Sequence, residues 1–397
     1  MSKPKSSLIK ELKLRGYIHQ CTNIEELDKL AAKKKLVAYI GFDCTAESLH
    51  VGSLIQLMII RILQKTGHQV VVLLGGGTSK IGDPSGKDKS RQLLNDKEIK
   101  NNSQNIRKNI EKFIIKNNSV TKVKFLDNSI WLNNINYISF LRTYGKNVSV
   151  NKMLSMDSVS ERLKREQPLS FLEFNYMIIQ AYDFLELNNR ENCEIQFGGS
   201  DQWGNITAGV DLVRRINKKE VFGLTTPLIT TASGDKMGKT SKGAVWLSEK
   251  LLSSDGYWQF WRNVDDKDVV NFLKLFTELE VKEINKLKSS NSNEINKNKE
   301  TLANLATDLC HGKNTADNFV IKKKDFIKGI QAFQILCLNK KIVQSNSESR
   351  RLIRGGAVKL NGELITDELK IFSEKNIKNN KIEVSIGKKN HFTIKII

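Results

Sequence analysis

Two short segments of the chain combine residue types that handle phosphate groups. Residues 48–53 read Ser-Leu-His-Val-Gly-Ser, with His50 two positions before a glycine, and residues 236–240 place Lys236 and Lys239 around Gly238. Backbone N–H groups at the start of a helix attract anions, and an imidazole there can donate a hydrogen bond to a phosphate oxygen. Lysines on a glycine-containing loop add positive charge. Together the two segments predict a site that holds a nucleoside triphosphate.

The surrounding pattern predicts the elements that position these segments. An apolar run at 36–42 precedes the first segment and an amphipathic run at 54–65 follows it, so the segment is a predicted strand-to-helix turn. Further strands are predicted at 70–74, 123–126 and 194–197, and helices at 55–64, 105–115, 174–187 and 201–216. This alternation predicts an α/β fold with a doubly wound, mostly parallel sheet. Ligands of such sheets bind at the carboxyl ends of the strands.

Two regions of different character follow. Residues 248–330 are charged and helical in pattern, whereas residues 331–397 are basic, with thirteen Lys/Arg against six Asp/Glu and therefore a net charge of +7. Within the second region, residues 347–362 predict a basic helix, a glycine turn at Gly355-Gly356, a strand and a tight turn at Asn361-Gly362. We therefore predict three domains, at 1–247, 248–330 and 331–397.

Composition bounds the class of protein. The 397-residue chain has a formal charge of +21, which favours a polyanionic partner such as RNA, although a general enrichment in Lys, Asn and Ile is an alternative source of the charge. No apolar run reaches transmembrane length, and none follows the basic N-terminus as a secretory signal would require. The five cysteines are scattered without metal-like spacing, so we expect free thiols, no bound metal and a cytoplasmic location.

Six ordered motifs resemble those of the bacterial-type tyrosyl-tRNA synthetases, a class I aminoacyl-tRNA synthetase family. They lie at residues 39–43, 45–52, 82–87, 176–183, 198–205 and 236–240. The C-terminal segment is similar to the S4-type RNA-binding domain of that family. The resemblance implies a Rossmann-like catalytic domain, an α-helical domain and a small α+β domain. It also implies a tyrosine–tRNA ligase that forms tyrosyl-adenylate from L-tyrosine and ATP with Mg²⁺, transfers tyrosine to the 3′-terminal adenosine of tRNA(Tyr), and acts as a homodimer.

The resemblance also implies roles for individual residues. The catalytic residues would be His50, Lys236, Lys239 and Thr240. The tyrosine-binding residues would be Tyr39, Thr78, Asp83, Tyr176, Gln180, Asp183 and Gln202. The ATP-binding residues would be Gly41, Asp43, Thr45, His50, Gly52, Ser53, Gly199, Asp201, Lys236, Met237 and Lys239. The tRNA-binding residues would be Lys87, Arg91, Arg350, Arg351 and Arg354.

The residue chemistry is compatible with these roles. Tyr176, Gln180 and Asp183 have the i, i+4, i+7 spacing of one helix face, and the resemblance puts Asp183 with Tyr39 at the substrate's phenolic hydroxyl.

Ser53 departs from the family, which usually has a second histidine at that position. A serine can cap the helix or donate one hydrogen bond, but it cannot carry charge.

The sequence also offers three other interpretations. The glycine-rich segment 75–87 suggests a P-loop, but Ile81 stands where the first glycine is required and Asp88 where Ser or Thr is required. A tryptophan-specific relative would share the fold and the lysine loop, yet Asp183 with Tyr39 suits a phenol better than an indole. A non-catalytic RNA-binding protein with this architecture is the third alternative.

Overall fold

The computed structural model describes residues 3–85, 93–116, 121–231, 234, 237–240, 243–287, 292–312, 319–321, 329–337, 343–377, 381–387 and 390–396. The chain divides into two compact units, the first of residues 1–248 with 270–288 and the second of residues 249–269 with 289–397. The three predicted domains remain a prediction. In the described residues, no helix is both long enough and apolar enough to cross a membrane.

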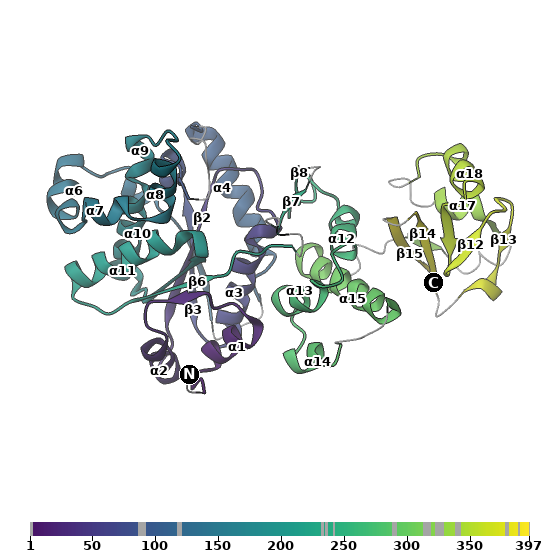
Figure 1. The fold of residues 1–397 in the computed structure, drawn as a ribbon, viewed down its shortest axis with the longest axis horizontal. Coiled ribbons are helices and arrows are strands. Elements are labelled where there is room, and N and C mark those ends of the chain that lie inside the picture. Colours follow the sequence, from purple (N-terminus) through teal and green to yellow (C-terminus); the bar gives the residue numbers. More distant parts are fainter. Residues whose placement is uncertain are drawn as a thin grey trace. The chain divides into compact units, whose positions relative to one another are not determined.

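A six-stranded sheet forms the centre of the first unit (Figure 1). Its strands, in sheet order, are β1 (Gln20–Cys21), β6 (Phe222–Thr226), β5 (Ile195–Gly199), β2 (Val37–Asp43), β3 (Gln69–Gly75) and β4 (Val123–Asp127). All neighbours pair in parallel except β1 with β6. The chain runs outward from β2 to β3 and β4, and then returns to the other side of β2 for β5 and β6. The strand order therefore reverses between β2 and β5, which is where doubly wound folds bind ligands.

Helices cover both faces of this sheet, which confirms the predicted fold class. Helices α10 (Tyr176–Glu191) and α11 (Trp203–Asn217) lie on one face, and α3 (Leu54–Lys65) and α4 (Asp96–Glu111) lie on the other (Figure 1). The core under α10 and α11 includes Tyr39 of β2 and Leu73 of β3. Five short helices lie between β4 and α10: α5 (Ser129–Leu132), α6 (Tyr137–Thr143), α7 (Val150–Leu154), α8 (Asp157–Lys164) and α9 (Phe171–Phe174).

The predicted bounds of one helix were wrong. We expected a helix at 105–115, but α4 begins at Asp96 and ends at Glu111. A capping box explains the early start, because the Asn95 side chain accepts from the Glu98 N–H and Glu98 accepts from the Asn95 N–H. The first turns of α4 are rich in polar residues, so apolar periodicity does not mark where the helix begins.

Two further groups of elements complete the first unit. Helices α1 (Ser7–Arg15) and α2 (Ile24–Lys33) flank β1, while α13 (Val269–Phe276) and α14 (Val281–Lys286) come from later in the chain. The buried Arg15 side chain donates to the carbonyl oxygens of Lys274, Thr277 and Leu279, each at 2.8 Å. These bonds satisfy backbone carbonyls at the end of α13, and they explain why residues 270–288 belong with the sheet.

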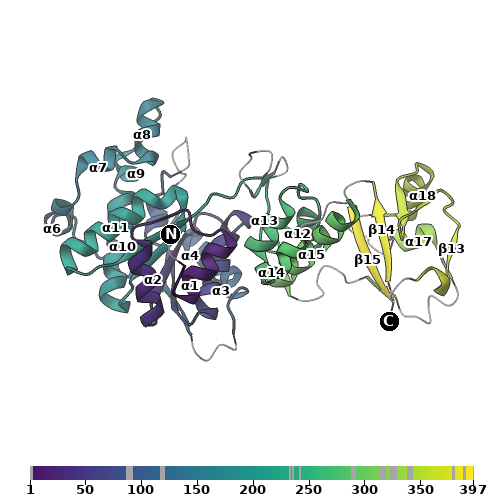
Figure 2. The same cartoon turned by 60° about the horizontal axis from the view of Figure 1, so that its bottom comes forward.

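The second unit combines helices with a small sheet. Helices α12 (Ser254–Arg262) and α15 (Ser292–His311) come first, and α17 (Ala332–Cys337) and α18 (Asn346–Arg354) pack on the C-terminal sheet (Figure 2). That sheet has the order β12 (Glu363–Ile365), β11 (Val358–Leu360), β14 (Lys381–Ile386), β15 (Asn390–Ile396) and β9 (Phe319–Ile321). A separate pair joins β10 (Ile330–Gln331) to β13 (Ile371–Phe372). The predicted order of basic helix, glycine turn, strand and Asn361-Gly362 turn is confirmed, with φ of 51° and 85° at the two turn residues.

Candidate active site

A cavity of about 190 Å³ opens at the carboxyl ends of β2, β3 and β5, at the reversal of strand order. Its walls come from three strands, from helices α3 and α10 and from the turns that follow the strands. All seven residues predicted to bind tyrosine line this cavity: Tyr39, Thr78, Asp83, Tyr176, Gln180, Asp183 and Gln202. Helical spacing predicted that Tyr176, Gln180 and Asp183 share one face, and the family resemblance implied the other four; the fold brings all seven together in space.

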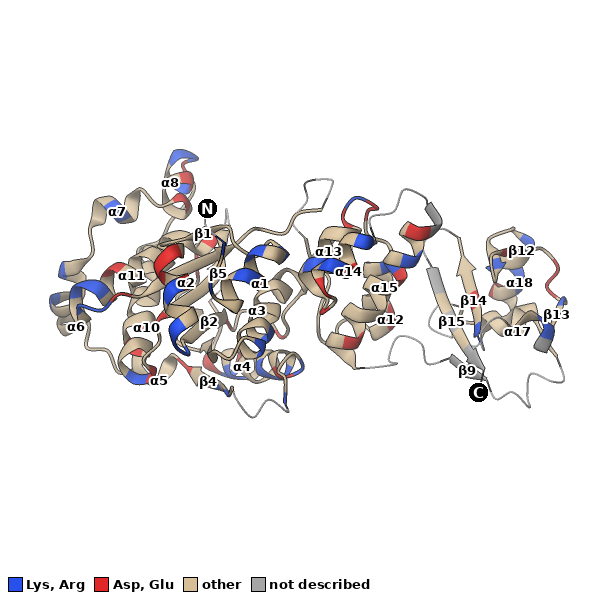
Figure 3. Ribbon diagram, turned by 90° about the horizontal axis from the view of Figure 1, so that it is seen from below, with Lys and Arg blue, Asp and Glu red and all other residues tan. Residues whose placement is uncertain are grey.

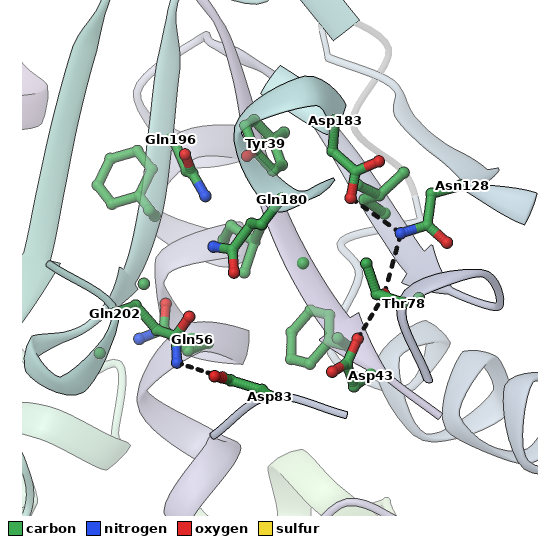
Figure 4. Close-up of a pocket in the computed structure, with 18 of the residues that line it drawn as sticks. Tyr39, Asp43, Gln56, Thr78, Asp83, Asn128, Gln180, Asp183, Gln196 and Gln202 are labelled. Atoms are coloured by element: carbon green, nitrogen blue, oxygen red, sulfur yellow. Dashed lines mark hydrogen bonds between the residues drawn. The ribbon is translucent and has the colours of Figure 1, made fainter. Parts of the chain in front are cut away.

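Asp183 forms one end of the cavity (Figure 4). Its carboxylate accepts from the Trp131 indole Nε1 at 2.7 Å and from the Asn128 amide at 2.9 Å. Burial nevertheless raises the pKa of this carboxyl to about 7, and the two hydrogen bonds oppose that rise. Asp183 is therefore a buried acceptor that titrates near neutral pH.

The Tyr39 hydroxyl at this end is buried and has no hydrogen-bond partner in the structure. Burial, followed by the nearby Asp183 charge, raises its pKa well above the ordinary tyrosine value. Tyr39 therefore stays protonated at neutral pH and can donate. A buried hydroxyl without a partner is costly, so a polar group of a ligand is the expected partner.

Asp43 connects two predicted site residues in the middle of the cavity. Its Oδ1 accepts from the Thr78 hydroxyl at 2.7 Å, and its Oδ2 accepts from the Tyr176 hydroxyl at 2.8 Å. Thr78 in turn accepts from the Asn128 amide at 3.0 Å, so a continuous chain of hydrogen bonds reaches Asp183. The chain fixes the rotamers of the residues that shape the cavity.

The Gly75-Gly76-Gly77 turn makes this network possible. A Cβ on Gly75 would lie 2.2 Å from the Asp43 carboxylate, and one on Gly76 would lie 2.3 Å from the carboxylate of Asp127. The glycines are thus required by the close approach of two carboxylates to the backbone, and not by a phosphate-binding loop.

The opposite end of the cavity carries Asp83 and several amides. The Gln202 side chain donates to Asp83 Oδ2 at 2.8 Å, and the Ser85 N–H donates to Oδ1 at 2.9 Å. The amide oxygens of Gln180 and Gln56 are buried without hydrogen-bond partners. These acceptors and the Asp83 carboxylate suit a cationic or N–H-bearing group of a ligand.

A second cavity of about 430 Å³ continues from the first. The two cavities share residues Gly41, Phe42, Asp43, Gln56, Gly199 and Gln202. The second is also lined by Thr45, His50, Gly52, Ser53, Asp201 and Met237, all of which are predicted ATP-binding residues. The carboxylate of Asp201 lies so close to Gly199 that a Cβ there would be 2.5 Å from it.

His50 stands where the chain enters the helix. The 3₁₀ turn η1 (Val51–Ser53) leads directly into α3, and the His50 Nδ1 atom accepts from the Gly52 N–H at 2.9 Å. The Nδ1 atom is therefore an acceptor, which leaves Nε2 as the nitrogen that carries the proton of the neutral ring. Isolated bridge pairing with Trp246 also holds the His50 backbone.

The two segments that suggested phosphate chemistry meet in the fold. A Cβ on Gly52 would lie 2.5 Å from the His50 ring and 3.3 Å from the Met237 carbonyl oxygen. A Cβ on Gly238 would lie 3.0 Å from His50 Nδ1 and 3.1 Å from the Gly52 nitrogen. The backbone of the lysine loop thus packs directly on the His50 turn.

Ser53 occupies the N-cap position of α3 but makes no capping hydrogen bond with its side chain. Ser53 could cap the helix or donate a hydrogen bond to a ligand, and the structure does not show it capping the helix. Its position on the wall of the second cavity leaves donation to a ligand as its role in our prediction.

Several predicted residues are described only in part. Lys87, Arg91 and Lys236 lie outside the described residues, and only the backbone of Lys239 and Thr240 is described, as strand β7 paired with β8 (Gly243–Ala244). In the second unit, Arg350 and Arg354 contact the Glu368 carboxylate, while Arg351 is exposed.

Sequence reasoning missed Gln56, Asn128, Trp131 and Gln196. Asn128 could have been found, because it lies two residues after the strand predicted at 123–126, at the edge where ligands bind. No sequence signal marks the other three residues, since their roles depend on contacts with elements far away in the chain. Among the described residues, no group of three or more His, Cys, Asp or Glu side chains could hold a metal ion.

Comparison with known proteins identifies the family. Residues 31–325 match the family model described as class I tRNA synthetases (W and Y). The tyrosine–tRNA ligase of Pelagibacter ubique is 52% identical, with 99% of this chain and 100% of the relative covered. That of Rickettsia typhi is 47% identical, with 98% of this chain and 100% of the relative covered.

Solved structures agree. A C-terminally truncated mitochondrial tyrosyl-tRNA synthetase of Aspergillus nidulans has a TM-score of 0.70 and 30% identity, covering 78% of this chain and 91% of that one. A tyrosyl-tRNA synthetase of Archaeoglobus fulgidus, at 18% identity and a TM-score of 0.58, covering 77% of this chain and 98% of that one, shares the fold. By family model, full-length relatives and fold, this chain belongs to the class I tRNA synthetases and, among them, to the bacterial-type tyrosine–tRNA ligases.

Proposed function

We propose that the two contiguous cavities carry out tyrosine activation, with L-tyrosine in the first and ATP with its Mg²⁺ in the second. This proposal rests on the polar groups that lie at the two ends of a cavity of amino-acid size. Asp183 and Tyr39 lie at one end, and Asp83 with unpaired amide oxygens lies at the other. A tyrosine molecule carries a phenol and an ammonium group at its two ends.

At the phenol end, the Asp183 carboxylate accepts from the substrate hydroxyl and the Tyr39 hydroxyl donates to it. Phenylalanine would leave the buried Tyr39 hydroxyl without a partner and would offer no donor to the Asp183 carboxylate, an effect for which tyrosine-specific synthetases are the standard example. An indole N–H could satisfy Asp183 but offers no acceptor for Tyr39. This difference, together with the relatives' names, favours tyrosine over tryptophan.

At the ammonium end, three groups supply acceptors. Asp83 provides a carboxylate, Gln180 provides an amide oxygen that has no partner in the structure, and Tyr176 provides a hydroxyl oxygen. The Tyr176 hydroxyl donates a hydrogen bond to Asp43, so the lone pairs of the Tyr176 oxygen are left for the substrate ammonium. Gln202, which donates to Asp83, lies at the junction of the cavities, where the substrate carboxylate and the α-phosphate meet.

The first step is attack of the tyrosine carboxylate on the α-phosphorus of ATP. A new P–O bond forms, the bond from the α-phosphorus to the bridging oxygen breaks, and pyrophosphate leaves with the electron pair. The carboxylate is ionised at neutral pH, so no general base is required. Catalysis then depends on holding both reactants in line and on stabilising charge on the phosphate oxygens.

His50 is the described residue best suited to that stabilisation. With Nδ1 held by the Gly52 N–H, the protonated Nε2 can donate to a phosphate oxygen from the wall of the second cavity. Lys236, Lys239 and Thr240 are assigned to the leaving pyrophosphate by the family motif, and Asp201 to the ribose hydroxyls. In the second step a hydroxyl of the tRNA 3′-terminal adenosine attacks the tyrosyl carbonyl, an ester forms and AMP leaves.

Exchange of labelled pyrophosphate into ATP tests this proposal. We expect exchange that depends on L-tyrosine and is absent with L-tryptophan. Exchange with tryptophan alone would overturn the specificity, and no exchange with either amino acid would favour the RNA-binding alternative.

The remaining partners are also proposals. We assign tRNA(Tyr) binding to the basic C-terminal segment with Arg350, Arg351 and Arg354, and to Lys87 and Arg91. A homodimer is supported by large apolar side chains that are at least half exposed on α6 to α9, namely Tyr137, Ile138, Val150, Leu163 and Phe171. Figure 1 shows these helices gathered at one side of the first unit. The five free cysteines fit a reducing cytoplasm.

A further inference from the structure

One carboxylate holds two of the arginines on α18. Arg354 donates to both oxygens of Glu368, from Nε at 2.6 Å and from Nη2 at 2.8 Å, and Arg350 donates from Nη1 at 3.2 Å. The Arg354 contact is bidentate, which is the arrangement that fixes the plane of a guanidinium group. Figure 3 shows basic residues on this helix.

Glu368 is also held to the core of the C-terminal segment, called the small module below (residues 331–397). Its carbonyl oxygen accepts from the Phe333 N–H at 3.2 Å, and the Phe333 ring lies 4.1 Å below the Arg350 guanidinium carbon. Phe333 belongs to the buried cluster that joins α17 and α18 to the sheet. Glu368 and Phe333 together therefore define where the Arg350 guanidinium lies.

The burial of the Glu368 side chain indicates that it supports the two arginines and does not compete with an anionic ligand for them. The Glu368 side chain is 12% exposed, whereas that of Arg354 is 69% exposed and that of Arg350 is 39% exposed. The carboxylate thus lies beneath the guanidinium groups, whose outer edges face solvent. The three bonds occupy a minority of the donors, since each guanidinium has five N–H groups.

We propose that Glu368 is a positioning residue for RNA, which orders Arg350 and Arg354 as a pair of donors for phosphates of the tRNA backbone. The inference rests on the proposed tRNA-binding role of the C-terminal segment. Ordering long side chains costs binding free energy, and a scaffold that orders them beforehand recovers part of it. Removing the negative charge of Glu368 should therefore weaken RNA binding, although the net positive charge of the module increases.

The test compares two glutamate-to-glutamine variants of the full chain. Glu363 lies on the same module, is 65% exposed and pairs with Lys370 at 2.7 Å, so E363Q makes the same charge change away from the arginines. Affinity for a tRNA(Tyr) transcript is measured by fluorescence anisotropy at several KCl concentrations. We expect E368Q to bind about 5-fold more weakly, with the salt slope reduced by about one phosphate contact, and E363Q to stay within about twofold. Binding by E368Q as tight as that of E363Q, or tighter, would overturn the proposal.

Two further variants separate this inference from the proposed function. In the double variant Arg350→Ala with Arg354→Ala, tRNA affinity should fall by more than in E368Q. If the double variant binds like wild type, the RNA surface is misassigned and the positioning role fails with it; if it binds weakly while E368Q does not, only the positioning role fails. Glu368→Asp keeps the charge and should bind more tightly than E368Q, an order that general unfolding of the module would not produce.

Discussion

At the scale of single residues, the ionisation of Asp183 links pH to substrate recognition. Burial raises its pKa to about 7, so the ionised fraction, which is the stronger acceptor for a phenol O–H, grows as pH rises through neutrality. We expect KM for tyrosine, measured by pyrophosphate exchange, to fall between about pH 6 and 8 and then level off. D183N should show no such dependence and should lower kcat/KM by about 10- to 100-fold at pH 8. An unchanged pH profile in D183N would assign the titration to another group.

The raised pKa of Asp183 also predicts an effect on the stability of the fold. Here the protonated form is favoured, whereas substrate recognition favours the ionised form. A carboxyl whose pKa is raised from 3.8 to about 7 on folding stabilises the folded chain when protonated, and this contribution is lost progressively as pH rises from about 4 to about 7. The ligand-free D183N variant should therefore gain more Tm relative to wild type at pH 8 than at pH 5, because part of the wild-type contribution is still present at pH 5. Differential scanning fluorimetry at both values checks the sign, and an equal difference at the two pH values would contradict it.

At the scale of elements, the turn between β2 and α3 has no room for a side chain on Gly52. A methyl group there would lie 2.5 Å from the His50 ring, so G52A must displace the imidazole or the lysine loop that packs on it. We expect kcat of pyrophosphate exchange to fall by about 10-fold or more, while KM for tyrosine changes little. Gly145→Ala is the matched control, because its nearest neighbour would be the Leu141 side chain at 3.3 Å. Equal activity of the two variants would remove His50 from the catalytic role.

At the scale of the whole molecule, strand pairing determines where the basic segment can be removed. Strand β9 pairs in parallel with β15, so a cut at the predicted boundary of 330 would separate β9 from its partner. Removal of residues 313–397 takes both strands together. We expect this truncation to retain tyrosine-dependent exchange within about twofold and to lose tRNA charging with the salt-sensitive RNA affinity. Normal charging by the truncated chain would show that RNA binding lies elsewhere.

The proposed dimer makes a second prediction at this scale. Phe171 is 69% exposed on α9, more than any other large apolar side chain of the α6 to α9 group. A charge placed there would be buried without a partner in an apolar interface, so F171E should shift the chain toward monomer. Light scattering coupled to size-exclusion chromatography measures the mass directly. Leu369→Glu, at a 50% exposed position in the second unit, should leave the mass unchanged. A monomeric wild type would remove the proposal.

The order of residues along the chain was enough to predict the family, the alternation of strands and helices, and the residues at which phosphate and phenol chemistry were expected. These features are local: His50 precedes a helix, and Tyr176 and Asp183 share one face of α10 because of helical periodicity alone. Which side chains contact one another depends on the folded chain. Trp131 and Asn128 reach Asp183 from the segment after β4, and Glu368 reaches two arginines that lie 14 and 18 residues before it. Hydrogen bonds act over about 3 Å, and only the folded backbone brings groups so far apart in the sequence within that distance.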